Sequence, residues 1–339
     1  MTRDDGRSSP EPAAAGRETR SARRSGASAI LCRLGLAGAL LGLALPWLTA
    51  LWLGFDVFSQ FTVHFLIIAA ACAVGLLVPR RGPAVAIALV VAGGLAIGGW
   101  AMLHRSGGFP ATAAPGTVRV MTFNTWTRNE DVTAIAAEVR RQKPDIVGMM
   151  EVVPAKRRLL DLLRADYPYL THCLDKQHCY LALFSRWPME KVAARSLWEG
   201  PPYLHVVVRT PTGPVHVFAV HTLRFPWLGS QLKQVKALGR LLRRVKGPKI
   251  VMGDFNATPF SVMLHTFVRR SGLRRQTWLP TWPAWAGPLP QLAIDHVFIS
   301  PELERVAGPW IGDAAGSDHF PVVIEVRPRG GAAGRRQGR

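Results

Sequence analysis

The chain has 339 residues, enough for one sizeable domain and an appendage, so a lone small domain is excluded. Its formal net charge of +20 at pH 7 favours phosphate-rich partners, either anionic lipid or nucleic acid. A solvated basic surface has the same composition, so charge by itself does not choose among these.

The N-terminal third consists of a polar tail followed by an apolar region. Residues 1–27 are rich in Arg, Ser, Pro, Ala and Gly, so we expect a disordered basic cytoplasmic tail. Residues 28–104 contain three apolar runs, each close to the ~20 residues that cross a bilayer as a helix, at 34–53, 61–78 and 83–103. A cleaved signal peptide would account for the first run only. The sequence therefore predicts three transmembrane helices.

Positive charge in the short loops predicts the orientation of these helices. The tail holds six arginines, the loop at 54–60 has no Lys or Arg, and Arg80 and Arg81 lie between the second and third runs. Because positive charge marks the cytoplasmic side, the tail and the second loop are predicted to be inside. We therefore expect a multi-pass protein of the cytoplasmic membrane, with everything after about residue 104 outside the cytoplasm.

The four cysteines fall into two pairs. Cys32 and Cys72 lie at or in the first two apolar runs and are interpreted as small apolar side chains. Cys173 and Cys179 both lie in the predicted outer domain, six residues apart. In an oxidising compartment they can form a disulfide, and two unpaired thiols are the alternative.

After a linker at 105–116, strand-like and helix-like segments alternate. The segments with helical spacing are 131–142, 155–166, 230–245 and 261–271. Strands outnumber helices and are often adjacent, so we predict an α/β domain with mixed sheets and not a doubly wound one. The Pro- and Trp-rich segment 278–290 is predicted to be a loop near the substrate, and 328–339 a disordered basic tail.

Acidic, amide and histidine side chains stand at the ends of six strand-like segments. In chain order they are Asn124, Glu151, His221, Asp254 with Asn256, Asp295, and Asp318 with His319. Hydrolysis of a phosphate ester needs an activated water, charge stabilisation on the phosphoryl oxygens and help for the leaving group. Six such clusters in one sequence are typical of a phosphoesterase active site.

The motifs GDFN at 253–256 and SDH at 317–319 resemble those of the endonuclease/exonuclease/phosphatase, or DNase I-like, superfamily. The resemblance covers about 118–326, so we place this domain at 117–327. It implies a four-layer α/β sandwich, two mixed β-sheets with outer helices, whose active site lies where strand ends of both sheets converge. The three preceding apolar runs make the chain similar to a membrane-anchored bacterial branch that includes VanJ-type teicoplanin-resistance proteins. For that branch the implied substrate is undecaprenyl pyrophosphate.

The resemblance also implies a divalent metal ion. Glu151 is the implied metal carboxylate, with Asn124 beside it and Asp318 completing the set. Oxygen ligands of this kind suit Mg²⁺ or Mn²⁺. We therefore expect a Mg²⁺- or Mn²⁺-dependent enzyme.

The remaining candidates receive catalytic and phosphate-binding roles from the same resemblance. His319 is expected over the phosphate, oriented by Asp295, and Asp254 is expected to orient or deprotonate the attacking water. His221 is expected to contact the phosphate or the leaving oxygen. The expected phosphate-binding side chains are Asn256, Asn124 and Arg186, although an arginine that closes a strand is as often a surface residue.

The sequence therefore favours a membrane-anchored, outward-facing hydrolase that acts on a lipid-linked or other envelope phosphate. Trp227 and the tryptophans of 278–285 suit a site against a bilayer, and ordinary loop packing is the alternative. An anchored extracellular nuclease with the same residues is the rival enzyme. A catalytically inactive envelope-binding protein is the rival of a different class.

Overall fold

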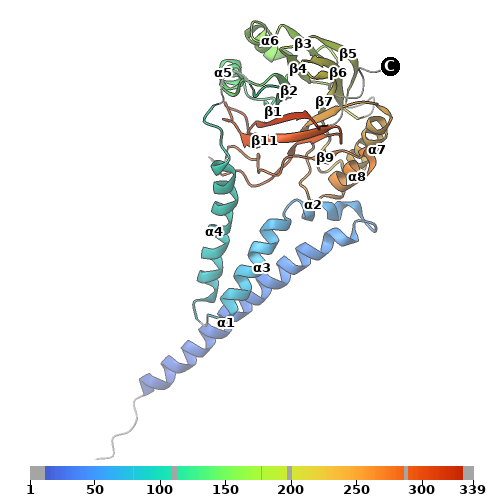
Figure 1. Ribbon diagram of the computed structural model, residues 1–339. Coiled ribbons are helices and arrows are strands. Elements are labelled where there is room, and N and C mark those ends of the chain that lie inside the picture. The colour runs from blue at the N-terminus through green and yellow to red at the C-terminus, as the bar shows by residue number, and fades with distance from the viewer. Residues whose placement is uncertain are drawn as a thin grey trace, which may run out of the picture. The chain divides into compact units, whose positions relative to one another are not determined.

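The computed structural model describes residues 12–78, 80–108, 113–176, 178–196, 201–285 and 289–330 (Figure 1). The chain divides into two compact units, one of Met1–Ala44 with Thr62–Gly93 and the other of Leu45–Phe61 with Gly94–Arg339. The second unit thus contains the predicted domain and also the segment between the first two apolar runs.

The first unit is helical. α1 (Pro12–Ala44) packs against α3 (Thr62–Leu76), and α4 (Gly82–Leu103) begins in this unit and continues in the second. Cys32 and Cys72 are buried in a small apolar cluster of this unit. Both therefore pack as small apolar side chains, as predicted.

Two helical stretches are long and apolar enough to cross a membrane, Gly26–Leu48 and Gly82–Leu103. The predicted middle span corresponds to a bent pair, Leu53–Ser59 and Thr62–Leu76, whose two parts meet at 63°. α3 alone has 15 residues, short of the ~20 that span a bilayer. Of the three predicted transmembrane helices, two are thus found as helices long and apolar enough to cross a membrane, and a third is counted only if the bent pair is one span.

α1 begins inside the segment that was predicted to be a disordered tail. Residues 12–27 are helical, whereas residues 1–11 lie outside the described part of the chain. Ala, Arg and Glu are frequent in this segment and have high helix propensity. Extending an existing apolar helix also avoids the cost of a new helical nucleus.

The first of two six-stranded mixed sheets has the strand order β11-β12-β1-β2-β4-β3. Its strands are β1 (Val118–Asn124), β2 (Ile146–Met150), β3 (Tyr169–His172), β4 (Ala182–Ser185), β11 (Leu303–Ile311) and β12 (Val322–Pro328). β1 is parallel to β2 and antiparallel to β12. The carboxyl ends of β1 and β2 and the start of β12 therefore meet at one edge.

The second sheet has the strand order β5-β6-β7-β8-β10-β9. Its strands are β5 (Met189–Arg195), β6 (Tyr203–Thr210), β7 (Gly213–His221), β8 (Lys249–Asp254), β9 (Arg274–Arg275) and β10 (Asp295–Ile299). β7 is parallel to β8, and β8 is antiparallel to β10. The ends of β7 and β8 and the start of β10 therefore lie together.

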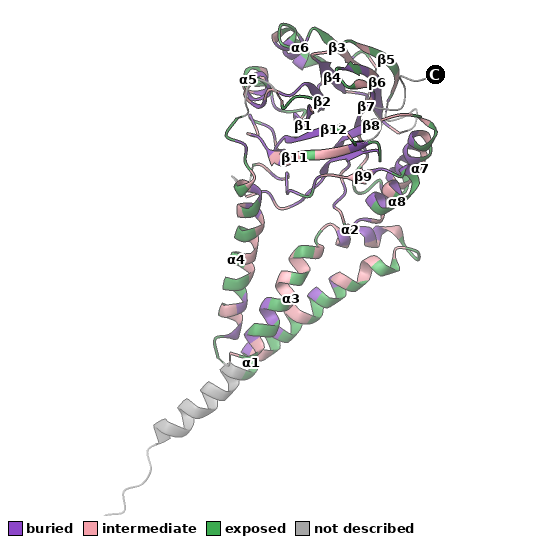
Figure 2. Cartoon of the chain, in the orientation of Figure 1, coloured by how far each residue is buried: buried purple, intermediate pink, exposed green. Residues whose placement is uncertain are grey.

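The two sheets pack face to face between two layers of helices, as Figure 2 shows by the burial of the strands. The core between the sheets contains Val120 and Ile146 of the first sheet and Val217 and Ile250 of the second. The first sheet is covered by α5 (Val132–Gln142) and α6 (Arg157–Leu163), and the 3-10 turn η3 (Pro154–Lys156) directly precedes α6. The second is covered by α7 (Leu228–Arg244) and α8 (Val262–Ser271). The predicted four-layer α/β sandwich is confirmed.

Four strands have no counterpart among the predicted ones, namely β3, β5, β9 and β11. Each lies at the outer edge of its sheet. β5 has mostly exposed or half-buried residues, and β3 has no buried residue. An edge strand with little buried surface lacks the apolar pattern on which a strand prediction depends.

The segment predicted as a linker is attached to the domain at its start. Arg105 forms a parallel bridge with Ile311 of β11, and Arg141 donates a hydrogen bond to the carbonyl of Ser106 (Nη1–O 2.8 Å). Residues 109–112 of the linker and 331–339 of the predicted basic tail lie outside the described part of the chain. The linker is therefore shorter than predicted at its N-terminal end.

Cys173 and Cys179 form a disulfide with a Cα–Cα distance of 5.6 Å. This resolves the alternative between a disulfide and two unpaired thiols. The bond joins the end of β3 to the loop before β4.

Candidate active site

The predicted site residues lie at one end of the space between the two sheets. Alternate side chains of a strand face the same side, and the residue that ends a strand keeps that alternation. Val120 of β1 and Met252 of β8 belong to the core between the sheets, so Asn124 and Asp254 face this space too. Counting in the same way along β7 and β10 adds His221 and Asp295.

The glycine of GDFN brings two of these residues together. Gly253 has φ 153°, and a Cβ at this position would lie 1.8 Å from the carbonyl oxygen of Val220. Only glycine therefore permits this close pairing of β7 with β8. The next pair in the register is His221 with Asp254, whose side chains lie 3.6 Å apart (Nε2–Oδ2).

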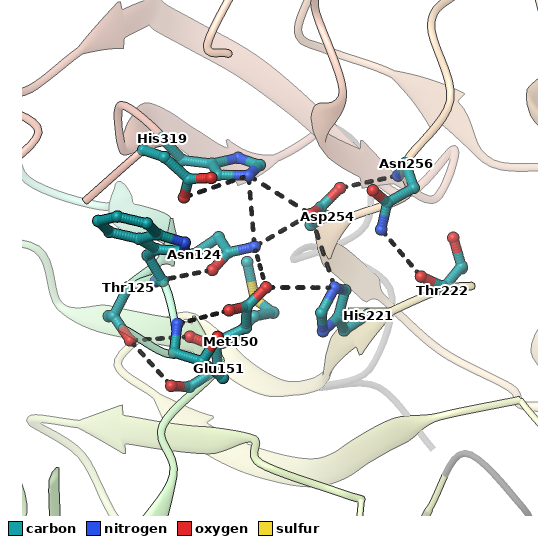
Figure 3. Close-up of polar contacts among 12 residues, drawn as sticks. Asn124, Thr125, Met150, Glu151, His221, Thr222, Asp254, Asn256 and His319 are labelled. Atoms are coloured by element: carbon teal, nitrogen blue, oxygen red, sulfur yellow. Dashed lines mark hydrogen bonds and ion pairs between the residues drawn. The ribbon is translucent and has the colours of Figure 1, made fainter. Parts of the chain in front are cut away.

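Asn124 lies at the centre of the cluster (Figure 3). Its Nδ2 donates hydrogen bonds to Glu151 Oε1 (3.1 Å) and Asp254 Oδ2 (3.0 Å), so it uses both amide hydrogens. Its Oδ1 accepts from the backbone N–H of Trp126 (3.0 Å). The carboxamide therefore fixes two carboxylates from different sheets relative to each other.

His319 and Asp295 form a buried ion pair, with 2.7 Å between Nδ1 and Oδ2. Burial disfavours the charged imidazole, but the carboxylate of Asp295 outweighs it and raises the pKa of His319 to about 10. Asp295 Oδ2 also accepts from the hydroxyl of Thr281 (2.6 Å). His319 is thus a cation near neutral pH, with its ring orientation fixed. Its Nε2 lies 3.8 Å from Asp254 Oδ2.

Asp254 is the carboxylate whose environment favours proton uptake. Burial, and next the charge of Asp295, raise its pKa to about 6, while His319 and His221 oppose the shift. Its Oδ1 accepts from the backbone N–H of Asn256 (2.7 Å). A carboxyl with a pKa near 6 can take a proton from water at neutral pH, as a general base requires.

Glu151 has the opposite electrostatics. Burial opposes its ionisation, but His221 and hydrogen bonds from Thr127 and Asn124 outweigh burial and lower its pKa to about 2. Its Oε2 accepts from the backbone N–H of Thr127 (2.6 Å), and its Oε1 lies 3.9 Å from His221 Nε2. Glu151 is therefore ionised throughout the neutral range, as a metal ligand must be.

Asp318 lies near Glu151, and its carboxylate oxygens accept fewer hydrogen bonds than those of Glu151. Its Oδ2 accepts from Trp282 Nε1 (3.3 Å), while its buried Oδ1 has no hydrogen-bond partner among the described residues. Burial first, and the charge of Glu151 among the smaller causes, raise its pKa. Two mutually repelling carboxylates, one with an unpaired buried oxygen, fit a divalent cation held with Asn124 nearby.

A second set of candidate metal ligands is Asp254, Asp295 and His319, whose ligand atoms lie within 4.8 Å of one another. His319 Nδ1 and Asp295 Oδ2 already share a 2.7 Å hydrogen bond. A cationic imidazole is also a poor metal ligand, because metals bind the neutral ring. The oxygen set of Glu151, Asn124 and Asp318 is therefore the better match to Mg²⁺ or Mn²⁺.

A cavity of about 730 Å³ opens over the cluster, and Asn256 lines it with Glu151, His221, Asp254 and His319. Asn256 has φ 47°, in the left-handed region. Its Nδ2 donates to the backbone carbonyl of Thr222 (2.9 Å), so the carboxamide is held at the cavity wall.

The structure does not bring Arg186 to this cavity, and its predicted phosphate-binding role is dropped. Arg186 follows β4, which runs antiparallel to β2, with Ser185 paired to Ile146. The end of β4 therefore lies at the start of β2, away from Glu151. There Arg186 Nη1 lies 3.7 Å from Asp145 Oδ1, and its guanidinium lies over the ring of Tyr167.

Lys156 was not among the predicted site residues, although it is a buried residue with 2% exposure. Its Nζ donates to the carbonyl oxygens of Thr125 (2.9 Å), Trp126 and Glu151 (3.2 Å). Burial lowers its pKa to about 8, against the charges of Glu151 and Asp318. Trp126 and Glu151 have φ 56° and 59°, so Lys156 ties together two loops that both contain a left-handed residue. It begins a helical pattern in the sequence, where a lysine ordinarily faces solvent.

We expect Lys156→Met to lower the free energy of unfolding by about 2–3 kcal/mol, because buried carbonyl oxygens lose their donor. Any catalytic rate that depends on Glu151 should fall at least ~10-fold, because the loop that contains Glu151 loses its hydrogen bond to Lys156. Thermal unfolding and initial rates measure the two effects. Lys233→Met, on the exposed face of α7, is the matched control. Equal stability of the two variants would show that Lys156 does not hold these loops.

The four-layer α/β sandwich thus has a cluster of carboxylates and histidines at one end of the space between its sheets. The sequence model of the Endonuclease/Exonuclease/phosphatase family matches residues 121–319, more than half of the chain. The chain belongs to this family, whose members are phosphoesterases and nucleases. A search of curated proteins gave no match to the chain.

Solved structures are similar to this chain at low sequence identity. An endonuclease/exonuclease/phosphatase from Beutenbergia cavernae is 24% identical over 62% of this chain and 72% of its own, with a TM-score of 0.48. Sphingomyelinase C from Streptomyces griseocarneus is 18% identical over 62% and 99%, with a TM-score of 0.47. Humanized TDP2 from D. rerio is 14% identical over 62% and 99%, with a TM-score of 0.51. These likenesses concern the fold alone.

Proposed function

We propose that the chain is a membrane-anchored, divalent-metal-dependent phosphoesterase whose domain faces the outside of the cytoplasmic membrane. The observation that carries this proposal is the pairing of Asp254, a carboxyl with a raised pKa, with the cationic His319. Titratable groups whose environments move their pKa values apart are characteristic of acid–base catalysis. Glu151, whose pKa is lowered, adds a second carboxylate. It follows β2 of the first sheet, whereas Asp254 ends β8 of the second.

Each residue of the cluster then has its own role in the reaction. Asp254 accepts a proton from the attacking water, and Asn124 and the Asn256 N–H hold its two oxygens in place. His319 stabilises negative charge on the phosphoryl oxygens, and His221 lies where it can contact the phosphate or the leaving oxygen. A divalent cation held by Glu151, Asp318 and Asn124 would polarise the phosphoryl group and neutralise charge that develops there.

Aromatic side chains at the cavity support a lipid-linked substrate. Phe225 is 59% exposed and Trp227 is 62% exposed, and both line the cavity together with Trp126, Trp282 and Leu292. A cavity that combines charged residues with exposed aromatic residues suits a phosphate on an isoprenoid or acyl chain at a bilayer surface, where tryptophan is favoured. Undecaprenyl pyrophosphate is our first candidate. Glycopeptide resistance of the VanJ type would be the associated phenotype.

The loop at 54–60 supports the proposed topology. Asp56 of this loop accepts hydrogen bonds from Ser261 and Val262 of the domain, which supports placing the loop and the domain on the same side of a membrane. The loop has no Lys or Arg, which by the charge rule assigns this shared side to the exterior.

The rival proposal is an anchored nuclease. Arg128 and Arg224 line the same cavity, and the chain has a net charge of +20, both of which favour a polyanionic strand. An inactive binding protein is disfavoured, because such a protein has no need of a carboxyl poised to accept a proton beside an ionised Glu151.

Phosphate release from undecaprenyl pyrophosphate by full-length protein in detergent with Mg²⁺, beside plasmid nicking by the same preparation, separates the two enzymes. Each assay is run against Asp254→Ala. Hydrolysis of bis(p-nitrophenyl) phosphate, compared with the monoester, reports the type of bond. Release without nicking supports the lipid-linked substrate, whereas nicking without release establishes the nuclease. Absence of Asp254-dependent hydrolysis from every substrate would sink the enzyme proposal.

Removal of metal with EDTA is expected to lower hydrolysis at least 100-fold, and Mg²⁺ or Mn²⁺ should restore it. Glu151→Gln should raise the metal concentration for half-maximal activity at least ~10-fold, because a charged ligand is lost. A metal titration of the initial rate measures both effects. Metal-independent turnover would remove Glu151 and Asp318 from this role.

A further inference from the structure

The segment between the first two apolar helices packs on the catalytic domain. Residues Leu45–Phe61 form η1 (Leu45–Leu48), η2 (Leu53–Phe55) and α2 (Asp56–Ser59), and they belong to the same compact unit as the domain. Leu53 packs against the apolar cluster formed by the second sheet with α7 and α8, and Figure 1 shows α2 beside α8. The sequence alone predicts only a short connection here.

Asp56 anchors this segment. Its side chain is 1% exposed, its Oδ2 accepts from the hydroxyl of Ser261 (2.6 Å), and its Oδ1 accepts from the backbone N–H of Val262 (2.8 Å). Ser261 is the N-cap of α8 and itself accepts from the N–H of Met263. A carboxylate at a helix N-terminus is stabilised by these donors and by the helix dipole. Burial of this charge therefore depends on α8.

Gln60 and Ser59 continue from this anchor to the turn that follows Asp254. Gln60 Oε1 accepts from the backbone N–H of Thr258 (2.7 Å), and the Ser59 carbonyl accepts from the Thr258 hydroxyl (3.3 Å). Thr258 is buried. Its N–H is thus satisfied by a side chain from a segment 198 residues earlier in the chain, and would otherwise be left unpaired.

The turn held in this way carries catalytic groups. Asp254 and Asn256 lie four and two residues before Thr258, in a turn where Asn256 has a left-handed backbone. Gln60 also lines the cavity that contains Glu151 and His221. The segment therefore contributes to the wall of the site and to the geometry of its base.

We propose that the segment between the first two apolar helices is part of the active site, with Gln60 as a positioning residue for the turn Asp254–Thr258 and Asp56 as its anchor. This inference rests on the proposed phosphoesterase function. It gives the membrane-proximal region a role in catalysis beyond tethering. Orientation errors of about 1 Å at a catalytic group can cost 10²-fold in rate, so loss of one hydrogen bond behind Asp254 has a measurable effect.

The test uses full-length protein in detergent with bis(p-nitrophenyl) phosphate, a water-soluble substrate that does not depend on membrane contact. Gln60→Ala should lower kcat on the order of tenfold with KM changed less than about threefold, because the base moves while the rest of the cavity remains. Leu51→Ala, an exposed position in the same segment, is the matched control and should leave both constants unchanged.

Amide hydrogen exchange of peptides covering 255–260 provides a readout that is independent of activity. Exchange should be slow in the wild type and in Gln60→Glu, which keeps the oxygen acceptor, and on the order of tenfold faster in Gln60→Ala. Equal exchange in all three would overturn the proposal, as would faster exchange with an unchanged kcat. If the wild type hydrolyses no substrate, the proposed function fails and the catalytic role fails with it. Exchange then still decides whether Gln60 holds the turn.

Discussion

Asp254→Asn is expected to lower kcat on the order of 10³-fold, the largest effect of any single substitution in this chain. Asparagine can still accept the hydrogen bond that the Asn256 N–H gives to Asp254 Oδ1, but it cannot take up a proton. Removal of this buried charge favours folding, but the new amide N–H faces Asn124 Nδ2, which donates to Asp254 Oδ2 in the wild type. The free energy of unfolding should therefore change by no more than about 2 kcal/mol. Initial rates and thermal unfolding measure the two effects.

If Asp254 is the general base, the direction in which kcat/KM changes with pH follows. A base works only when it is deprotonated, so kcat/KM should fall as pH is lowered through about 6, the pKa of Asp254, and not through its ordinary value near 3.8. At high pH the rate should fall again near 10, where His319 loses its proton. The two limbs belong to the coupled cluster as a whole.

Asp161→Asn is the matched control for this substitution, because Asp161 is exposed on α6. It should leave the rate and the pH profile unchanged. A loss of less than tenfold in Asp254→Asn, with the acid limb still near pH 6, would assign the base to another group.

His319→Ala is expected to lower kcat on the order of 10²-fold, because a buried cation that faces the phosphoryl oxygens is removed. Asp295 then remains as a buried carboxylate without its 2.7 Å partner, so stability should fall as well. His265→Ala, at an exposed position of α8, is the control. Rates and unfolding temperatures are measured side by side.

A double-mutant cycle separates orientation from direct contact. Asp295→Asn should also lower the rate, because His319 loses the group that holds its ring and its charge. If Asp295 acts only through His319, the double variant should be no slower than His319→Ala alone. A loss below about threefold for His319→Ala, or fully additive losses, would contradict the paired role.

The strand-end residues were predictable because their signal is local. Asn124, Glu151, His221 and Asp254 each end an apolar strand, and strands buried on both faces read as continuous apolar runs. Their convergence follows once the strands are assigned to two packed sheets, since alternation then determines the face. The disulfide could be named only as an alternative, because spacing does not give a Cα–Cα distance.

Arg186 shows where such reasoning fails. It ends a strand as Glu151 does, but the direction of β4 places it at the opposite edge. The direction of a strand depends on the strands with which it pairs, so the residues around Arg186 alone do not reveal it. The middle apolar run is a similar case, since its composition suits a span while the helix breaks at residues 60–61.

The amino-acid sequence by itself determined the class of fold, the apolar N-terminal region and the chemistry-bearing residues at strand ends, because each depends on local pattern and composition. Only the tertiary structure decided which of them meet. Lys156 and Gln60 have no local signature, because each acts through hydrogen bonds to backbone groups that are distant in sequence or hidden under a helix. The pKa values of Asp254, Glu151 and His319 likewise arise from burial and from charges on other strands, which exist only once both sheets have packed.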